Sequence, residues 1–241
     1  MLTETGQVVF RYAEEIFSIG RELMDTLKGR PTGRPLQLLV GVVDMLPKSV
    51  VYRLIEPAFQ LPSPVQIVCR EDPPDRMLGL LAMHQLDLIL SDAPLPAGSS
   101  VRAFNHSLGD CAVGFYAKLK GAEKLKRGFP RSLEGTPMLL PTESAALRAE
   151  LDEWFEAQGI RPLVAGAFDD FSLIRIFASA GRGIFAAPLI LDAEMRRSYG
   201  FVHIGSAKEV RMRFYAISVE RRIKHPAVVA ICETARQKLF R

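Results

Sequence analysis

One stretch, Phe168–Pro188, constrains the fold more than any other part of the chain, because it combines the end of a strand, a short helix and a second strand. Residues 164–168 are apolar and β-prone, and Asp169 and Asp170 then stand where a helix N-cap is expected. Residues 184–187 are short and apolar, as in a strand covered on both faces. This order predicts a right-handed βαβ unit. Because ligands of open parallel sheets lie beyond the carboxyl ends of the strands, Asp169 marks the first candidate site position.

The helix inside this stretch is predicted from the spacing of its apolar residues. Leu173, Ile174 and Phe177 fall three and four positions apart, so we expect them to form one buried stripe. Ala180–Gly181 is expected to end the helix, since glycine accepts the left-handed conformation found after many helix C-termini.

The same alternation of strand and helix occurs twice in the chain, which is typical of open α/β sheets. The first set has strands at 36–42, 65–69 and 87–90, with a helix in each of the two gaps. Asp44 or Ser49 is expected to open the first helix, whose buried face runs from Val51 to Phe59. The second helix is expected at 77–85. The second set has a strand at 137–140, a helix at 144–158 that Gly159 ends, and the βαβ unit.

Four more segments are apolar or aromatic enough to be strands. They are 101–107 and 111–117, joined by a turn at Gly109–Asp110, then 201–204 and 210–219. The last helix begins at Pro226 and ends near residue 240. The chain is therefore predicted to be an α/β protein of two lobes joined by two crossings, lobe I from 36–92 and 210–241 and lobe II from 100–208.

A long helix is predicted for the N-terminal segment, residues 3–28 within a first region 1–30. One heptad seam contains Val9, Tyr12, Ile16, Ile19 and Leu23, and a second seam lies beside it with Phe10, Ala13, Phe17, Met24 and Leu27. Two adjacent stripes indicate contact with two bodies, for example a partner helix and another domain. A helix that lies across its own core remains the alternative.

Composition narrows the function classes. Apolar residues make up 48% of the 241 residues and charged residues 24%, as in an ordinary globular protein, and the net charge of +4 is too mild to imply nucleic-acid binding. The basic stretch 118–131 is interpreted as a solvated helix face. Three scattered cysteines, Cys69, Cys111 and Cys232, indicate buried thiols in a reducing cytoplasm. No signal peptide or membrane span is expected, which predicts a cytoplasmic protein without a membrane partner.

No catalytic motif is present, so we expect no enzyme activity and no cofactor. The four histidines, His84, His106, His203 and His225, are far apart and none has a partner at metal-ligand spacing, which leaves a metal site open. The glycines of AGRG at 180–183 precede a strand instead of following one, so they are not a phosphate-binding loop.

Acidic and hydroxyl residues follow the predicted strands in both lobes. They are Asp44, Glu71, Asp72, Ser91, Asp92, Thr142, Glu143, Ser144, Asp169 and Asp170. In a two-lobed fold these strand ends face one cleft, and helix N-termini there favour anions. Because carboxylates already occupy the positions, a cation or a polar neutral molecule is the expected ligand. The alternative is that these residues are helix caps and nothing more.

At this point the chain resembles the LysR-type transcriptional regulators. The opening LTETGQVVFRYAEEIFSIGRELMDTL is similar to the linker helix of that family, which pairs two subunits. The family's effector-binding domain, a type 2 periplasmic-binding-protein fold, is resembled by LQLLVGVVDMLPKSVVYRLIEPAF, LDLILSD, LLPTESAALRAELDEWFEAQGI and SLIRIFASAGRGIFAAP. The likeness is greatest to the subgroup that controls sodium/proton antiporters, through GVVDMLPK, GAFDDFSLIRIFA and HPAVVAICETAR.

The resemblance implies an effector pocket and a dimerisation helix. Carried over position by position, the pocket wall is Asp44, Met45, Glu71, Ser91, Asp92, Thr142, Ser144, Phe168 and Asp169. The dimerisation residues are Val9, Tyr12, Ile16, Ile19 and Leu23. The subgroup implies Na⁺ or Li⁺ as effector, held by carboxylate and carbonyl oxygens.

The resemblance also sets expectations for partners. A small-molecule or ion effector and a second copy of the chain, in a dimer or tetramer, are the expected partners. The winged helix-turn-helix of the family is expected to be absent here, so DNA would be read only through that missing domain. Two alternatives stay open at this point: a stand-alone solute-binding protein, and an enzyme that uses the carboxylates.

Overall fold

The computed structural model describes residues 3, 6, 9, 10, 12, 13, 16, 17, 20, 36–118, 122–221 and 223–240. The chain forms two compact units, Met1–Leu36 and Gln37–Arg241. In the first unit, the described positions from Gly6 to Gly20 are helical, as predicted. Ile19 and Leu23 of the predicted dimerisation seam lie outside the described residues.

Within the described residues, eight strands form one mixed sheet in the order β2-β1-β3-β8-β4-β7-β5-β6. Their bounds are β1 (Leu36–Val42), β2 (Val65–Glu71), β3 (Leu88–Ser91), β4 (Phe104–Ala117), β5 (Pro137–Pro141), β6 (Leu163–Phe168), β7 (Ile184–Pro188) and β8 (Val202–Ser218). β1 is parallel to β3, and β5 is parallel to both β6 and β7. The predicted βαβ unit is therefore present, with β5 between its two strands.

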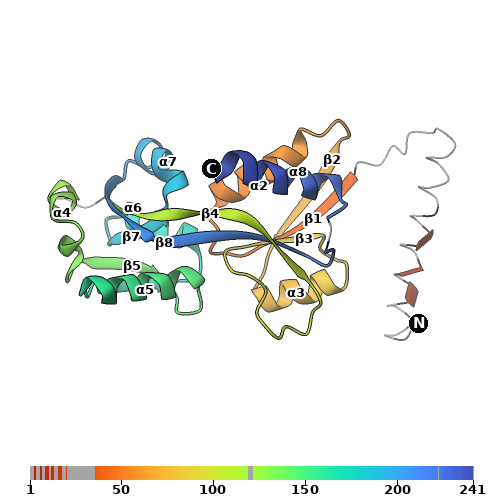
Figure 1. Cartoon of the computed structure of the whole chain (residues 1–241), viewed down its shortest axis with the longest axis horizontal. Helices are drawn as coiled ribbons and strands as arrows, with labels where there is room; N and C mark the ends of the chain where they lie inside the picture. Colours follow the sequence, from red (N-terminus) through yellow and green to blue (C-terminus); the bar gives the residue numbers. More distant parts are fainter. Residues whose placement is uncertain are drawn as a thin grey trace. The chain divides into compact units, whose positions relative to one another are not determined.

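Two long antiparallel strands join the two halves of the larger unit (Figure 1). The C-terminal end of β8 pairs with β3, where Ile217 lies opposite Ile89. The C-terminal end of β4 pairs with β7, where Phe115 lies opposite Ala186. The fold is thus the predicted α/β fold of two lobes, with β1–β3 in lobe I and β5–β7 in lobe II. The residue boundaries predicted for the lobes remain a proposal, because residues 37–241 form one compact unit.

The sequence prediction was wrong in dividing each of these long strands into two. Gly109 and Asp110 do not form a hairpin turn, because they continue the ladder opposite Phe214 and Arg213, with a register shift beside Ser107. Gly109 has a φ of 142°, and a Cβ at this position would lie 2.5 Å from the Cβ of Phe240. Glycine is therefore required where the bulged strand passes under the end of the chain.

Seven helices with described bounds cover this sheet. They are α2 (Lys48–Phe59), α3 (Pro74–Ala82), α4 (Ala122–Gly128), α5 (Ala146–Gln158), α6 (Phe171–Ser179), α7 (Asp192–Arg197) and α8 (Pro226–Thr234). The predicted C-terminal end of α5 and the predicted N-terminal cap of α6 are confirmed. Gly159, after α5, has a φ of 63°. The carboxylate of Asp170, before α6, accepts a hydrogen bond from the backbone N–H of Ser172. The predicted cap of α2 is wrong, because Pro47 is the N-cap and no side chain caps it.

The predicted buried stripe of α6 is wrong in two of its three residues. Ile174 is buried, but Leu173 and Phe177 are 44% and 43% exposed. The helix instead packs through Phe171, Ile174 and Ala178. The reason is that α6 is apolar on most sides, so that residue spacing alone does not decide which side is inside.

The apolar side chains that α6 leaves exposed continue onto the edge strand β6. We call this surface the β6–α6 face, and its members are Leu163, Val164, Leu173, Ile176 and Phe177. In lobe I, α2 exposes Tyr52 and also Phe59, which was predicted to be buried. Phe59 is the last residue of α2 and points away from the core that Leu54, Ile55 and Ala58 form.

Candidate functional site

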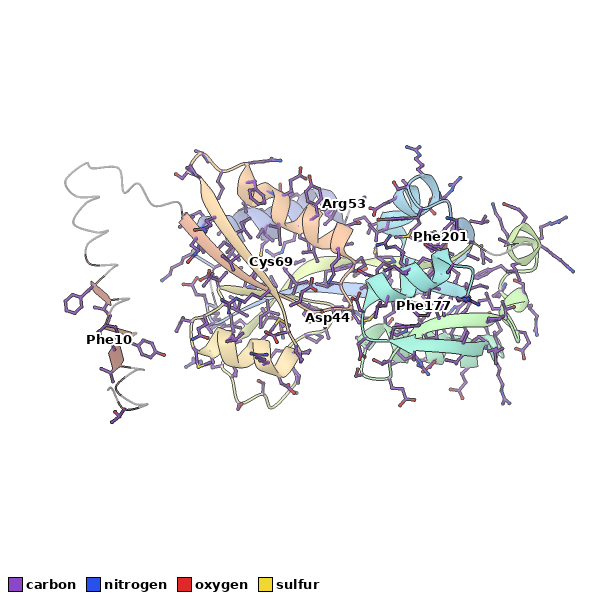
Figure 2. All side chains as sticks on the ribbon, turned by 180° about the vertical axis from the view of Figure 1, so that it is seen from behind. Phe10, Asp44, Arg53, Cys69, Phe177 and Phe201 are labelled. Atoms are coloured by element: carbon purple, nitrogen blue, oxygen red, sulfur yellow. The ribbon has the colours of Figure 1, made fainter. Side chains whose placement is uncertain are left out.

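A cavity of about 450 Å³ lies at the carboxyl ends of strands from both lobes. Asp44 follows β1 and Ser91 ends β3, while Thr142 follows β5 and Asp169 follows β6. Figure 2 shows Asp44 where the two lobes meet. The strand-end rule therefore brings residues that are far apart in sequence to one place.

Seven of the nine residues predicted for the pocket line this cavity in the described part of the chain. They are Asp44, Met45, Ser91, Asp92, Thr142, Ser144 and Asp169. That they bind an effector stays a prediction.

Glu71 and Phe168 do not line the cavity, and each has a partner elsewhere. The carboxylate of Glu71 accepts a hydrogen bond from the Lys48 ammonium at 2.6 Å, in an exposed ion pair. The ring of Phe168 packs against Phe177 of α6, with 4.9 Å between the ring centroids. A strand end thus brings a residue near the cavity, but its neighbours decide which way the side chain turns.

Apart from Asp72, which belongs to the acidic and hydroxyl set predicted to face the cleft, the other lining residues were not predicted to be in the pocket. The loop after β3 contributes Ala93, Pro94, Leu95 and Pro96, and the start of α3 contributes Asp72, Pro73, Pro74 and Leu78. The remaining ones are Val43, Ile89, Ala145, Ala146 and Ile217. The loop after β3 falls between the predicted bounds of the two lobes, 36–92 and 100–208, and was assigned to neither of them. Its position directly after a strand that ends in the cleft was the signal that could have found it.

The polar groups of lobe II form one hydrogen-bonded set. The hydroxyl of Thr142 donates to the carboxylate of Asp169, and the Ser144 hydroxyl lies 3.1 Å from that of Thr142. In lobe I the Ser91 hydroxyl accepts a hydrogen bond from the backbone N–H of Ala93 at 3.1 Å. Both sides of the cavity therefore present oxygen atoms whose positions are fixed by neighbours.

The titratable side chains among the described lining residues of the cavity are all aspartates. Burial raises the pKa of Asp44, with further increases from Glu71, Asp170 and Asp169, and Lys48 opposes them. Burial also raises the pKa of Asp92, whose Oδ2 atom is buried and has no hydrogen-bond partner in the described structure. No lysine, arginine or histidine is among the described lining residues. A cation or a hydrogen-bond donor would satisfy these carboxyl groups, whereas the ionised aspartates would repel an anion.

Neither a cluster of metal ligands nor a membrane-spanning helix is found in the part of the chain that the structure describes. Among the described residues, no group of three or more histidine, cysteine or acidic side chains is close enough to hold a metal ion. An ion in the cavity would therefore need hydroxyl or carbonyl oxygens as well as carboxylates. None of the helices in the described part of the chain has the length and apolar character that a membrane crossing requires.

Comparison with known proteins places these features in a family. The LysR substrate binding domain matches residues 33–240. The transcriptional activator protein NhaR of Escherichia coli (strain K12) is 33% identical over 238 residues, which cover 99% of this chain and 78% of that protein.

Solved structures show the same fold. A putative LysR family transcriptional regulator, PA01 protein from Pseudomonas aeruginosa, is 18% identical with a TM-score of 0.65, covering 100% of this chain and 83% of its own. The effector binding domain of QuiR in complex with shikimate is 14% identical with a TM-score of 0.61, covering 86% of this chain and 98% of its own.

These matches decide between the alternatives that the sequence left open. A stand-alone solute-binding protein is set aside, because both the family match and the relative NhaR are those of transcriptional regulators. The chain belongs to the LysR family of transcriptional regulators, and residues 33–240 are its ligand-sensing regulatory domain.

Proposed function

We propose that the cavity between the lobes binds the effector of this regulator, and that the effector is a small cation or a neutral molecule rich in hydrogen-bond donors. One observation carries the proposal: four aspartates, Asp44, Asp72, Asp92 and Asp169, line the cavity, and no basic side chain is found among its described lining residues. An organic anion of the kind that QuiR holds, shikimate, would be repelled by this set.

The effector acts by bridging the lobes. Asp44 and Asp92 belong to lobe I, and Thr142 and Asp169 belong to lobe II, so a ligand that contacts both sets binds one lobe angle better than another. Such differential binding is what allows a ligand to shift a conformational equilibrium. The lobe angle is then transmitted to the DNA-binding heads of the assembled regulator.

Sodium is the specific cation that we put first. The likeness to NhaR and the antiporter-controlling subgroup supports it, and so do the carboxylate and hydroxyl oxygens of the cavity. The regulator would then control a sodium/proton antiporter. A small organic ammonium ion is the second candidate, because a cavity of about 450 Å³ exceeds the space that a bare ion fills.

Melting temperatures test the proposal. The chain is heated in NaCl, LiCl, KCl and choline chloride at equal ionic strength, and then with putrescine or shikimate at constant salt. We expect stabilisation by Na⁺ and Li⁺ above K⁺, or by putrescine, and its loss in Asp169→Asn. Equal melting curves in all four salts reject sodium, and stabilisation by shikimate alone rejects the cationic effector.

The second part of the proposal concerns assembly. The described seam residues Val9, Tyr12 and Ile16 have exposed side chains, and so does the β6–α6 face of lobe II. Exposed apolar surface of this extent is expected to be covered by another protein surface, for which we propose a second copy of the chain, in a dimer or tetramer. The regulator is proposed to act in the cytoplasm without catalysis, and to contact DNA through the family's DNA-binding domain.

A further inference from the structure

Helix α2 of lobe I and helix α7 of lobe II are joined by side chains. The Glu194 carboxylate accepts a hydrogen bond from the Ser49 hydroxyl and lies 3.6 Å from Nη2 of Arg53. Nη1 of Arg53 donates to the carbonyl oxygen of Ile190 at 3.1 Å. Ser49 and Arg53 are four residues apart and so share one face of α2. We call this set the α2–α7 contact.

The side chains of the α2–α7 contact are largely shielded from solvent, which strengthens the interactions between them. The side chain of Glu194 is only 19% exposed and that of Arg53 35% exposed. Such a carboxylate is stabilised by a charge-assisted hydrogen bond from Ser49 on one oxygen and by the ion pair with Arg53 on the other. Losing a partner leaves a largely buried charge unpaired.

This contact and the effector cavity lie on different sides of the strands that join the lobes. None of Ser49, Arg53, Ile190 and Glu194 lines the cavity. In Figure 1, α2 and α7 lie above β4 and β8, whereas α3 and α5, whose first residues line the cavity, lie below them. Figure 2 shows Arg53 on α2 at the side nearer to lobe II.

Between the two sides lie the parts that can act as a hinge. The long strands β4 and β8 cross from lobe to lobe, and their ladder shifts register between Ser107 and Gly109 and again between Ala112 and Val113. Beside the cavity, the backbone N–H of Phe171 contacts the carbonyl oxygen of Asp44 at 3.4 Å. A few strand residues can absorb a change in lobe angle, as hinges do.

We propose that Ser49, Arg53 and Glu194 are positioning residues that hold the lobes at one angle and keep the effector cavity open. Because the contact and the cavity lie on opposite sides of the hinge, narrowing the cavity pulls α2 and α7 apart. An effector that closes the cavity therefore has to work against the α2–α7 contact. The regulatory meaning of this device rests on the proposed function, but its existence does not depend on the effector.

A distance measurement without any effector tests the device. Spin labels are attached at Met83→Cys, at the end of α3, and Glu153→Cys, on α5, in a full-length chain with Cys69→Ser and Cys111→Ser. Both labelled positions are exposed, and Cys232 is buried. Labelled protein is diluted into unlabelled protein so that distances within one chain dominate the pulsed dipolar signal.

The double variant Ser49→Ala, Arg53→Ala should shift the α3–α5 distance to shorter values and broaden its distribution. Glu194→Gln should shorten the α3–α5 distance by a smaller amount. The distance distribution of Glu194→Asp should lie closer to that of the parent protein than the distribution of Glu194→Ala does. The matched control is Arg196→Ala, which removes the ion pair of an exposed arginine with Asp192 within α7 and changes no side chain of α2.

An unchanged distribution in the double variant overturns the device, and so does an equal shift in Arg196→Ala. Circular dichroism of every variant at the same temperature shows that the protein compared is folded, and a variant that unfolds is replaced by Arg53→Gln alone. If the distance shifts while no cation stabilises the chain, the device stands and the proposed cationic effector fails.

Discussion

The hydroxyl of Thr142 donates a hydrogen bond to the carboxylate of Asp169, and the two residues follow neighbouring parallel strands, β5 and β6. This contact holds one carboxylate oxygen of Asp169 on the lobe II side of the cavity. A ligand in the cavity meets a carboxylate whose direction is already set, so less conformational entropy is lost on binding.

Asp169→Asn is expected to weaken binding of a cationic effector by about tenfold, or ~1.4 kcal/mol, because an amide keeps the shape of the side chain but loses its charge. Thr142→Ala should have a smaller effect in the same direction, since the carboxylate remains but is free to turn. Isothermal titration calorimetry with NaCl or putrescine measures both.

The matched control for these variants is Asp75→Asn. Asp75 is an exposed acid in the first turn of α3 and does not line the cavity, so this variant changes the net charge equally. If Asp75→Asn weakens binding as much as Asp169→Asn does, the effect comes from overall charge and the cavity is not the site.

Ser144→Trp is expected to abolish the effector response without unfolding the domain. Ser144 lines the cavity and its side chain is otherwise exposed, so an indole at this position fills ligand space instead of displacing core atoms. The measurement compares effector-induced melting shifts with the melting temperature of the free variant. Ser144→Ala is the control, because it removes the hydroxyl and adds no volume.

Several parts of the fold follow from short-range patterns. Residues 184–187 are buried as predicted, because a short apolar run between polar ends has no other place in an open parallel sheet. The cap at Asp170 and the stop at Gly159 were also predicted, since both depend on local backbone chemistry alone.

The errors arise where distant contacts decide the structure. Leu173 and Phe177 are exposed because α6 is apolar on more than one side, and only its packing on the sheet selects Ile174 for the interior. Gly109 continues a strand because β8 pairs with it on one side and Phe240 covers it.

In the candidate site, too, some features follow from the sequence pattern and others depend on distant contacts. Strand ends identified Asp44 and Asp169 correctly as neighbours across the cleft, because topology alone determines where parallel strands end. Topology does not determine side-chain direction, so the ion pair of Glu71 with Lys48 was not foreseen. Leu95 and the prolines beside it carry no polar signal at all.

Asp92→Asn is expected to stabilise the domain at neutral pH by about 1–2 kcal/mol, since it removes a buried charge with an unpartnered oxygen. Burial raises the pKa of Asp92, so the folded state holds its proton more tightly than the unfolded state. The stability from this proton is fully present below the unfolded pKa and is lost as pH rises through the folded pKa.

The advantage of the Asp92→Asn variant should therefore grow from low pH towards neutral pH. Urea unfolding of both proteins between about pH 4 and pH 7 measures it, the lower limit being close to the ordinary pKa of an aspartate. A constant difference across this range would mean that the pKa of Asp92 is the same in the folded and the unfolded state, as for a solvated carboxyl group.

The last prediction concerns the two apolar surfaces. Ile176→Asp places a charge in the β6–α6 face and Ile16→Asp places one in the helical seam, and both side chains are exposed in the isolated chain. If a second copy covers these surfaces, an unpaired carboxylate there is costly, so each variant should lower the assembly state without lowering the melting temperature of the monomer. Sedimentation velocity over a range of concentrations measures the assembly state.

The control is Ser179→Asp, at an exposed position of α6 outside the apolar set. Loss of assembly with Ile16→Asp alone would place the contact in the N-terminal helix, whereas loss with both would indicate that each surface contributes, as expected for a tetramer built from two kinds of interface.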